Sequence, residues 1–555
     1  MILASGAPWS FFEVPPRGAA PGSDPTASPQ LAPKNGVRRT VDVVTAVPRR
    51  APEQSSGVDR PRLAVAVWAV AGVVVLALLM VAGRYGFHGD EFYFVVTGRH
   101  LQVAAPDNPM LVPYLAAGWY GLAGGNLWAF RVLPALASGA YVLLGGLIAR
   151  EFSAVPRHQV AAAVAVAMTA LTLAVGHLFE TTTFDMVTTA AALWLFVRAM
   201  RSEPQRWTPW IAAGVLTGVA MEIKILAAPL LVCCLLGVMI CGPRSRLRSP
   251  RLWAAVAIAL LMAAPNLVWQ ALHGFPMLQV AANIAGGGST SSTPRLALVP
   301  SVLLAVGPVV SIVLIVGLIV LLRSDHRGTD GWLAAGFLIF VAFLLITGGK
   351  AYYPAGFVPA VLAAGAGPVL DWVIRGRLWR PVLAVGLIVI SVVATALLTL
   401  PVGRPGGPVF TTATGPNPDL AAEVGWPGYV DQIGEVVASI PAAHRADTIV
   451  LTQTYQQAAA LNLLQPANGV TIPAVYSGHN GFWFWGPPPE SATDAIVIAD
   501  FSPADLATGY AHCEVAGTVQ TPPGVDNDLT GTPIHRCTGL RQPWSVLWPQ
   551  LATFA

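Results

Sequence analysis

The sequence predicts a polytopic α-helical membrane protein that carries a polar α/β domain at its C-terminal end. Only 11% of the 555 residues are charged and 54% are hydrophobic, whereas soluble proteins carry roughly 25% charged residues. Apolar runs recur between residues 63 and 400, and each is long enough to cross a hydrocarbon layer of about 30 Å. Beyond Pro401 the composition becomes ordinary for a soluble domain.

The N-terminal part of the chain divides into a polar tail and a first apolar run. Residues 1–60 are rich in Pro, Ser, Ala and Gly and lack hydrophobic periodicity, which predicts a disordered cytoplasmic tail. Residues 63–83 follow Arg60 and Arg62 and are expected to form an uncleaved membrane anchor. Ten further spans are expected within the membrane domain, residues 61–400: 126–149, 159–178, 183–200, 208–223, 225–241, 252–272, 296–322, 331–347, 354–374 and 380–400.

The distribution of basic residues favours eleven spans. Residues 208–241 could instead form one long helix, because only Glu222, Lys224 and Pro229 interrupt the run. With eleven spans and a cytoplasmic N-terminus, one set of loops carries fourteen arginines and the opposite set five basic residues, as the positive-inside rule requires. This topology places the loop of residues 84–125 and the domain of residues 401–555 outside the cytoplasm.

The C-terminal region, residues 401–555, has the patterns of a small extracytoplasmic α/β domain. Residues 448–452, 470–476 and 495–499 are expected to be strands, and residues 429–440 an amphipathic helix. A disulfide between Cys513 and Cys537 is chemically permitted if this region lies outside the cell. The chain lacks a basic patch with interleaved aromatic residues, so no nucleic-acid partner is expected.

Three acidic residues are candidates for catalysis. Asp90 and Glu91 follow the first span directly, and two adjacent carboxylates at a membrane surface raise the pKa of at least one of them, as a general base needs. A solvated acidic pair is the alternative, and a divalent metal ion could also bind at Asp90 and Glu91. Asp185 lies near the outer end of the fourth span, where a carboxylate is costly; a local ion pair would also explain it.

Cationic and aromatic side chains are candidates for binding an anionic substrate. Lys224 and Lys350 fall at predicted outer ends, against the positive-inside bias, so each either binds a phosphate or snorkels to the interface. Tyr352 and Tyr353 add hydroxyl groups beside Lys350. Arg131, just inside the second span, could contact a phosphate or pair with a nearby carboxylate.

An aromatic loop, residues 477–488, is the most distinctive motif of the C-terminal domain. His479 and Asn480 can donate and accept hydrogen bonds to hydroxyl groups. Trp483 and Trp485 could stack on sugar rings, or the loop could anchor at the membrane interface instead.

The order of these motifs resembles the polyprenyl-phosphate-dependent glycosyltransferases of family 39, in a bacterial branch. This family includes protein O-mannosyltransferases and lipid A aminoarabinose transferases. The resemblance covers residues 63–490, and its motifs are GDEFYF at 89–94 and the segments 106–113, 130–134, 181–185, 349–356, 425–430 and 477–488. In relatives the segment that begins at Asp107 often has a second consecutive proline, where this chain has Met110.

The resemblance implies a GT-C fold of about eleven membrane helices with a catalytic first external loop. It implies Asp90 as the catalytic base with Glu91 beside it, Asp185 as the acidic residue of the fourth span, and Lys350 as a contact to the lipid phosphate. The implied reaction transfers a sugar, with inversion, from a polyprenyl-phosphate donor to a protein, lipid or cell-wall glycan at the outer face of the bacterial cytoplasmic membrane.

Two other function classes stay open at the level of the sequence. A transporter or lipid-linked-glycan flippase would place ionisable residues near the membrane midplane, often in paired repeats, whereas here they gather at the outer ends of spans. A non-catalytic envelope scaffold would bind glycan without transferring sugar. The identities of the sugar and the acceptor do not follow from the residues.

Overall fold

Helices dominate the protein, with one small sheet near the C-terminal end. The structure, a computed structural model, describes residues 61–288, 292–323 and 328–554. The predicted disordered tail, residues 1–60, lies outside the described residues.

Within the described residues, five helical segments are long and apolar enough to cross a membrane. They are α4–α5 (Leu127–Phe130 and Val132–Glu151), α8 (Thr181–Met200), α11 (Pro250–Leu272), η3–α16 (Tyr353–Phe357 and Val358–Ile374) and α17 (Trp379–Thr399). Three shorter apolar helices accompany them: α1 (Val65–Val81), α10 (Ala227–Cys241) and α15 (Gly331–Thr347). The chain is therefore a multi-pass membrane protein.

The structure interrupts two of the predicted spans. Residues 159–178 form two helices, α6 (Pro156–Ala167) and α7 (Ala170–Ala174). Residues 296–322 form α13 (Leu298–Val306) and α14 (Pro308–Leu322), which bend by 104° at Gly307. The bend needs a glycine because Gly307 has a φ of 100°, and Pro308 then starts the next helix.

The ambiguous run of residues 208–241 forms two helices. They are α9 (Trp207–Ile223) and α10, and the break falls at Lys224, whose backbone is extended. This is the arrangement that the eleven-span prediction requires.

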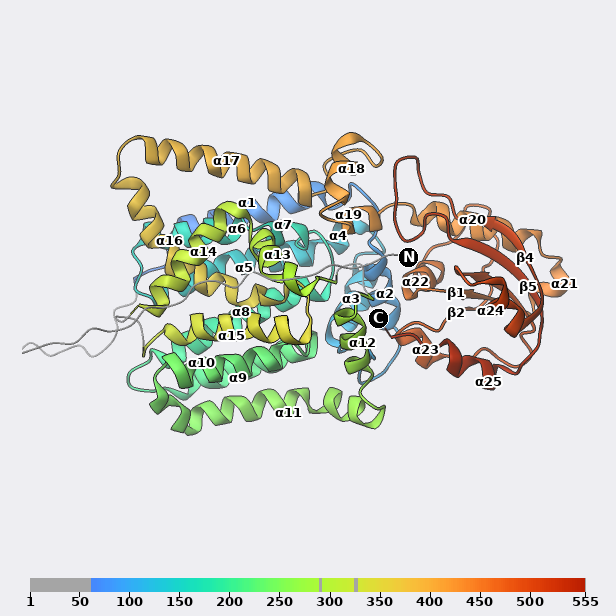
Figure 1. Cartoon of the computed structure of the whole chain (residues 1–555), viewed down its shortest axis with the longest axis horizontal. Helices are drawn as coiled ribbons and strands as arrows, with labels where there is room; N and C mark the ends of the chain where they lie inside the picture. The colour runs from blue at the N-terminus through green and yellow to red at the C-terminus, as the bar shows by residue number, and fades with distance from the viewer. Residues whose placement is uncertain (1–60, 289–291, 324–327, 555) are drawn as a thin grey trace, which may run out of the picture. The chain divides into compact units, whose positions relative to one another are not determined.

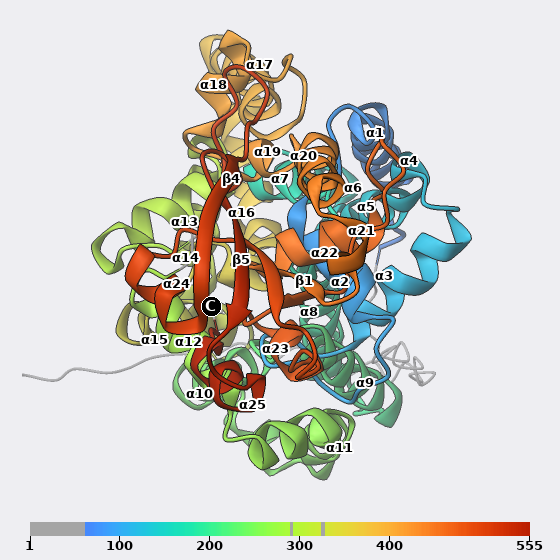
Figure 2. The same cartoon turned by 90° about the vertical axis from the view of Figure 1, so that its right-hand side faces the viewer.

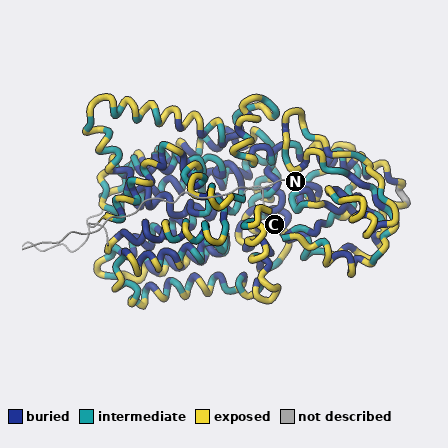
Figure 3. The backbone as a smooth tube through the Cα atoms, in the orientation of Figure 1, coloured by how far each residue is buried: buried dark blue, intermediate teal, exposed yellow. Residues whose placement is uncertain are grey.

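Burial separates the inner helices of the bundle from the lipid-facing ones. The most apolar window of α8 is 67% buried, against 28% for α11 and 17% for α17. Figure 3 shows exposed residues along α17 and α11, at opposite edges of the bundle. Apolar side chains on the surface of those two helices would contact lipid tails, so their exposure is expected in a membrane protein.

Three helices outside the long apolar segments lie between the bundle and the C-terminal region (Figure 1). They are α2 (Gly89–Thr97), α3 (Leu111–Leu122) and α12 (Pro276–Ala285). Phe92 and Tyr93 of α2 belong to one buried cluster with Trp426 and Tyr429 of the C-terminal region. The C-terminal region is therefore packed through a shared core onto the loop of residues 84–125.

The C-terminal region contains a five-stranded mixed sheet with the order β2-β1-β3-β5-β4. The strands are β1 (Thr448–Thr452), β2 (Val475–Ser477), β3 (Asp494–Ile498), β4 (Tyr510–Thr518) and β5 (Pro533–Leu540). β1 pairs in parallel with β2 and β3, and β5 pairs antiparallel with β3 and β4. Cys513 and Cys537 face each other across β4 and β5 and form a disulfide.

The remaining helices of the chain are short, apart from α20, which spans the predicted amphipathic segment. They are η1 (Arg244–Arg248), η2 (Arg295–Ala297), α18 (Pro408–Thr414), α19 (Asp419–Ala422), α20 (Trp426–Ser439), α21 (Ala442–Arg445), α22 (Tyr455–Leu463), α23 (Gly481–Trp485), α24 (Pro503–Gly509), α25 (Trp544–Leu547) and η4 (Trp548–Leu551). Helix α22 packs against α2, as Figure 2 shows from the side of the C-terminal region.

Candidate active site

The site is built around the first turn of α2. His88 is the N-cap residue: in the neutral ring its Nδ1 accepts from the backbone N–H of Asp90 at 3.2 Å, and the Glu91 carboxylate accepts from the backbone N–H of His88 at 2.8 Å. This reciprocal pattern satisfies two N–H groups that a helix start leaves unpaired. A side chain at Gly89 would approach Trp426 and Gln456 within 2.9 Å, so glycine is needed there.

Asp90 points toward the C-terminal region. Its Oδ1 accepts hydrogen bonds from the Tyr455 hydroxyl and from Gln456 Nε2, both at 2.9 Å. Both donors belong to α22, 365 and 366 residues away in sequence. No described residue hydrogen-bonds the second carboxylate oxygen, which leaves it available to accept a proton or a hydrogen bond from a substrate.

Glu91 points away from Asp90 into a buried ion pair. Arg131 donates to both of its oxygens, from Nε at 3.0 Å and from Nη2 at 2.7 Å, and neither side chain is exposed. Arg131 Nη1 also donates to Glu423 at 2.9 Å. A phosphate contact for Arg131 and a catalytic or metal-binding role for Glu91 are therefore not supported, because each group is buried and engaged by the other.

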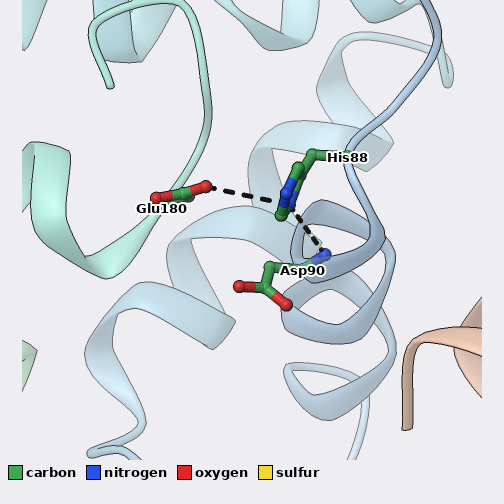
Figure 4. A group of neighbouring side chains, drawn as sticks. All are labelled: His88, Asp90 and Glu180. Atoms are coloured by element: carbon green, nitrogen blue, oxygen red, sulfur yellow. Dashed lines mark hydrogen bonds and ion pairs between the residues drawn. The ribbon is translucent and has the colours of Figure 1, made fainter. Parts of the chain in front are cut away.

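Acidic groups and one histidine surround Asp90. Glu180 Oε1 lies 3.7 Å from His88 Nδ1, and Figure 4 shows both side chains beside Asp90. Burial alone disfavours a charged His88, but the carboxylates of Asp90, Glu180 and Asp419 outweigh it and raise the pKa of His88 to about 9. Burial raises the pKa of Glu180 to about 8, although the nearby His88 opposes this shift.

These side chains could also hold a metal ion. His88, Asp90 and Glu180 each offer one ligand atom, and the three atoms lie within 4.8 Å of one another. One imidazole nitrogen and two carboxylate oxygens suit a first-row divalent cation. Of the two metal ligands predicted from the sequence, Asp90 belongs to this set and Glu91 does not.

Stability is expected to fall as the pH rises from about 6.5 to 9. The folded state raises the pKa of His88 from 6.5 to about 9, so the stability gained from its proton is present below pH 6.5 and lost as the pH passes 9. The raised pKa of Glu180 acts in the same direction from pH 4.5 to about 8. The effect of His88 is on the order of 3 kcal/mol.

Thermal unfolding of the solubilised protein at several pH values measures this effect. His88→Asn keeps an N-cap acceptor but removes the titrating ring, so its unfolding temperature should change little between pH 6.5 and 9. An equally steep decline in wild type and variant would contradict the assignment to His88.

The two lysines and the paired tyrosines lie together. Lys224 Nζ is 5.0 Å from the ring centroids of both Tyr352 and Tyr353, and Lys350 Nζ is 6.0 Å from that of Tyr352. Burial lowers the pKa of Lys350, while the carboxylates of Asp90, Asp419 and Glu180 oppose the change. Lys350 is therefore within electrostatic range of Asp90.

Asp185 interacts with one of the two lysines. Its Oδ1 accepts from Thr189 Oγ1 at 3.0 Å, and it interacts electrostatically with Lys224. Lys224 Nζ lies 3.4 Å from Thr182 Oγ1. Pairwise electrostatic interactions therefore link Asp90 to Lys350, Lys350 to Lys224, and Lys224 to Asp185.

The aromatic loop approaches Asp90 from the C-terminal region. The His479 ring lies 4.8 Å from that of Tyr455, and Asn480 Nδ2 lies 3.5 Å from Asp107 Oδ2. The Trp485 ring stacks on His100 with centroids 3.8 Å apart, and Trp483 donates to the backbone of Trp548 at 3.1 Å. The two tryptophans therefore hold the loop in position, and these contacts already cover part of their surface.

Several residues of the site have no strong signal in the sequence. Tyr455, Gln456 and Glu423 lie hundreds of residues from Asp90, and only the fold brings them to it. Asp107 accepts from the Tyr93 hydroxyl at 2.9 Å, and burial raises its pKa to about 6. In the sequence, Asp107 is singled out by its position in the motif that departs from the family pattern.

Comparison with known proteins adds a family match over part of the chain and a fold. Residues 107–269 match the family model described as dolichyl-phosphate-mannose-protein mannosyltransferase. The apo structure of ArnT from Cupriavidus metallidurans superposes with a TM-score of 0.52 at 14% identity, covering 84% of this chain and 97% of that one. The chain therefore has the GT-C fold that the sequence predicted.

Other solved structures resemble this chain more weakly. Arabinofuranosyltransferase AftD from Mycobacteria gives a TM-score of 0.49 at 15% identity, covering 87% of this chain and 42% of that one. The oligosaccharyltransferase AglB from Archaeoglobus fulgidus, in complex with an inhibitory peptide and a dolichol-phosphate, gives 0.45 at 13% identity, covering 78% and 69%. No curated protein sequence matches this chain.

Proposed function

We propose that this protein is a glycosyltransferase that moves a sugar from a polyprenyl-phosphate carrier to a hydroxyl of a protein, lipid or cell-wall glycan. The observation that carries the proposal is the placement of Asp90 within electrostatic range of Lys350, where the α2 loop meets the C-terminal region. One side of the site thus offers a base and the other offers cations. The donor class named by the matching family model supports the same reading.

Asp90 is the general base of the proposed reaction. Its carboxylate takes the proton of the acceptor hydroxyl while that oxygen attacks the anomeric carbon of the sugar. The bond from the anomeric carbon to the phosphate oxygen breaks, and its electron pair leaves with the polyprenyl phosphate. A single displacement of this kind inverts the anomeric configuration. Tyr455 and Gln456 hold Oδ1, so Oδ2 is the oxygen that receives the proton.

Lys224 and Lys350 stabilise the departing phosphate. Preorganised cations aimed at developing charge are usually the largest electrostatic contribution to a transfer reaction. The Tyr352 ring lies against both ammonium groups, which limits their movement. Asp185 interacts electrostatically with Lys224.

The acceptor enters from the side of the aromatic loop. His479 and Asn480 lie beside Tyr455 and Asp107 and supply hydrogen bonds for acceptor hydroxyls. Trp485 and Trp483 shape that entrance by fastening the loop rather than by stacking freely on a sugar.

The site faces the outer side of the bacterial cytoplasmic membrane in this proposal. The loops that carry fourteen of the arginines were assigned to the cytoplasm. Ion pairs such as Arg201–Asp330 and Arg246–Glu203 join neighbouring loops of that set, which supports their lying at one end of the bundle. The C-terminal region and the α2 loop then share the opposite, extracytoplasmic side.

Variants of the two lysines test the proposed donor contact. Lys224→Met and Lys350→Met should each raise the KM for the lipid-linked donor about 10-fold or more, because a hydrogen bond to a charged group is worth about 1.5–3 kcal/mol. The assay measures sugar transfer by purified protein in lipid nanodiscs over a range of donor concentrations. Arg295→Met removes an exposed cation from η2 and serves as the matched control. Unchanged KM values in both lysine variants would reject the phosphate site.

A further inference from the structure

A buried group of four charged or ionisable side chains joins the α2 loop to the C-terminal region. Arg131 lies at its centre and donates to Glu91 from Nε and Nη2 and to Glu423 from Nη1. His177 Nε2 lies 3.2 Å from the other oxygen of Glu423. The side chains of Arg131, Glu91 and Glu423 are all 0% exposed.

Glu423 is tied to the same loop through its backbone. Its carbonyl accepts from the Gly86 N–H at 3.0 Å, and a Cβ at Gly86 would approach that carbonyl oxygen to 2.6 Å. Glycine at position 86 is therefore what allows the segment after α19 to lie against the loop. Burial alone raises the pKa of Glu423, but Arg131 and His177 outweigh it and hold the pKa below its usual range.

We infer that Glu423 is a positioning residue for the catalytic base Asp90. Glu423 fixes the guanidinium of Arg131, and Arg131 grips both oxygens of Glu91, the residue that follows Asp90. Glu91 also accepts from the backbone N–H groups of His88 and Phe179 at 2.8 and 2.9 Å. The inference rests on the proposed function only in assigning Asp90 as the base.

The C-terminal region thus holds the first turn of α2 from two directions. Tyr455 and Gln456 bind the Asp90 carboxylate directly, while Glu423 acts through Arg131 and Glu91 on the backbone of the same turn. If the charge of Glu423 is lost, Arg131 Nη1 faces a neutral amide oxygen in place of the carboxylate, beside the Ala82 carbonyl at 3.1 Å. Arg131 then holds the Glu91 carboxylate less firmly, and the neighbouring Asp90 shifts with the first turn of α2.

The charge balance explains why a carboxylate is needed at position 423. The two ring nitrogens of His177 each face an oxygen: the Leu173 carbonyl at 3.1 Å and the Glu423 carboxylate at 3.2 Å. Arg131 lies between the Glu91 and Glu423 carboxylates, so its guanidinium is paired with a carboxylate on both sides. Charges buried together require such pairing, because an unpaired one is costly.

The test is Glu423→Gln in the full-length protein, reconstituted in nanodiscs. The variant keeps the size of the side chain and removes its charge. We expect kcat to fall about 100-fold, the cost of a misplacement near 1 Å, with the KM for the donor unchanged. Glu423→Asp keeps the charge and should recover part of the lost kcat. The matched control is Glu514→Gln, which neutralises a half-exposed carboxylate on β4.

Hydrogen exchange supplies a readout that does not depend on activity. Amides of residues 88–97 should exchange faster in Glu423→Gln than in wild type, and not in Glu514→Gln. If Glu423→Gln does not fold, Gly86→Ala replaces it, since the added Cβ displaces the Glu423 carbonyl without changing any charge. Wild-type exchange and wild-type kcat in the variant that folds would overturn the inference.

The two proposals can fail separately. Wild-type protein that transfers no sugar would remove the proposed function, while faster exchange in α2 would still support the positioning contact. Transfer by wild type that is insensitive to Glu423→Gln, with unchanged exchange, would remove the positioning role and leave the proposed function intact.

Discussion

Replacing Asp90 by asparagine is expected to lower sugar transfer by roughly 100- to 10,000-fold, the usual contribution of a general base. Asparagine fills the same space and its carbonyl oxygen still accepts from Tyr455 and Gln456, which bind Asp90 at 2.9 Å. It cannot take a proton from the acceptor. The loss should therefore appear in kcat, measured as transfer from the lipid-linked donor by protein in nanodiscs.

Donor binding and folding are the controls for this variant. Asp90→Asn should unfold at a temperature close to that of wild type and should bind the donor at least as well, because a carboxylate near the donor phosphate is lost. Asp526→Asn, at an exposed acidic position of the C-terminal region, should transfer sugar normally. Near-normal transfer by Asp90→Asn would reject Asp90 as the base.

Replacing Arg131 by methionine is expected to cost about 3–5 kcal/mol of folding stability, the range for breaking a buried ion pair by removing one partner. Arg131 is 0% exposed and pairs with Glu91 and Glu423. Its loss leaves two carboxylates buried together without a neighbouring guanidinium. Thermal unfolding of the solubilised protein should show a large fall in the unfolding temperature, or no folded protein should be recovered.

Arg84→Met is the control for Arg131→Met. It also removes an arginine at the start of the loop of residues 84–125, but this arginine is not part of a buried ion pair. Arg84 is exposed and, among the described residues, donates only to the Val402 carbonyl, at 3.2 Å, so its replacement should change stability by less than about 1 kcal/mol. The variant Arg131→Met with Glu91→Gln should recover part of the stability, because one unpaired carboxylate is removed with its partner. An Arg131→Met protein as stable as wild type would show that the buried pairs do not hold the loop.

The membrane part of the fold follows closely from the sequence because lipid imposes a simple rule. Every backbone polar group in the hydrocarbon layer must be satisfied within its own segment, so long apolar runs form helices and can be read directly. The rule does not reveal the 104° bend between α13 and α14. That bend depends on the backbone conformation of Gly307. A glycine within an apolar run does not by itself predict a bend.

The site was predicted in part, and the division has a physical cause. Asp90, Lys350 and Lys224 could be named because a charge at the end of an apolar run is costly and conspicuous. Arg131 was conspicuous for the same reason, yet its charge serves a buried ion pair with Glu91 and Glu423. The free-energy cost of a charge at the end of a span therefore indicates that the residue has a partner. It does not tell whether that partner is a substrate or another side chain.

The C-terminal contribution could not be predicted from local patterns. Tyr455 and Gln456 lie at the start of an ordinary helix capped by Thr454, and nothing in that segment distinguishes it from others. They matter because α22 packs against α2. Strands β4 and β5 were missed for a related reason: most residues of β4 are exposed, and the pairing of the two strands is stabilised by the disulfide between Cys513 and Cys537.

The fate of the donor lipid tests the central claim most directly. Purified protein in proteoliposomes would be given a polyprenyl-phosphate sugar and an envelope extract, and the lipid products would be separated and weighed by mass spectrometry. The account predicts one free polyprenyl phosphate for each sugar transferred, with release abolished in Asp90→Asn. Movement of the intact lipid-linked sugar across the bilayer, with no free polyprenyl phosphate formed, would contradict it and identify a flippase.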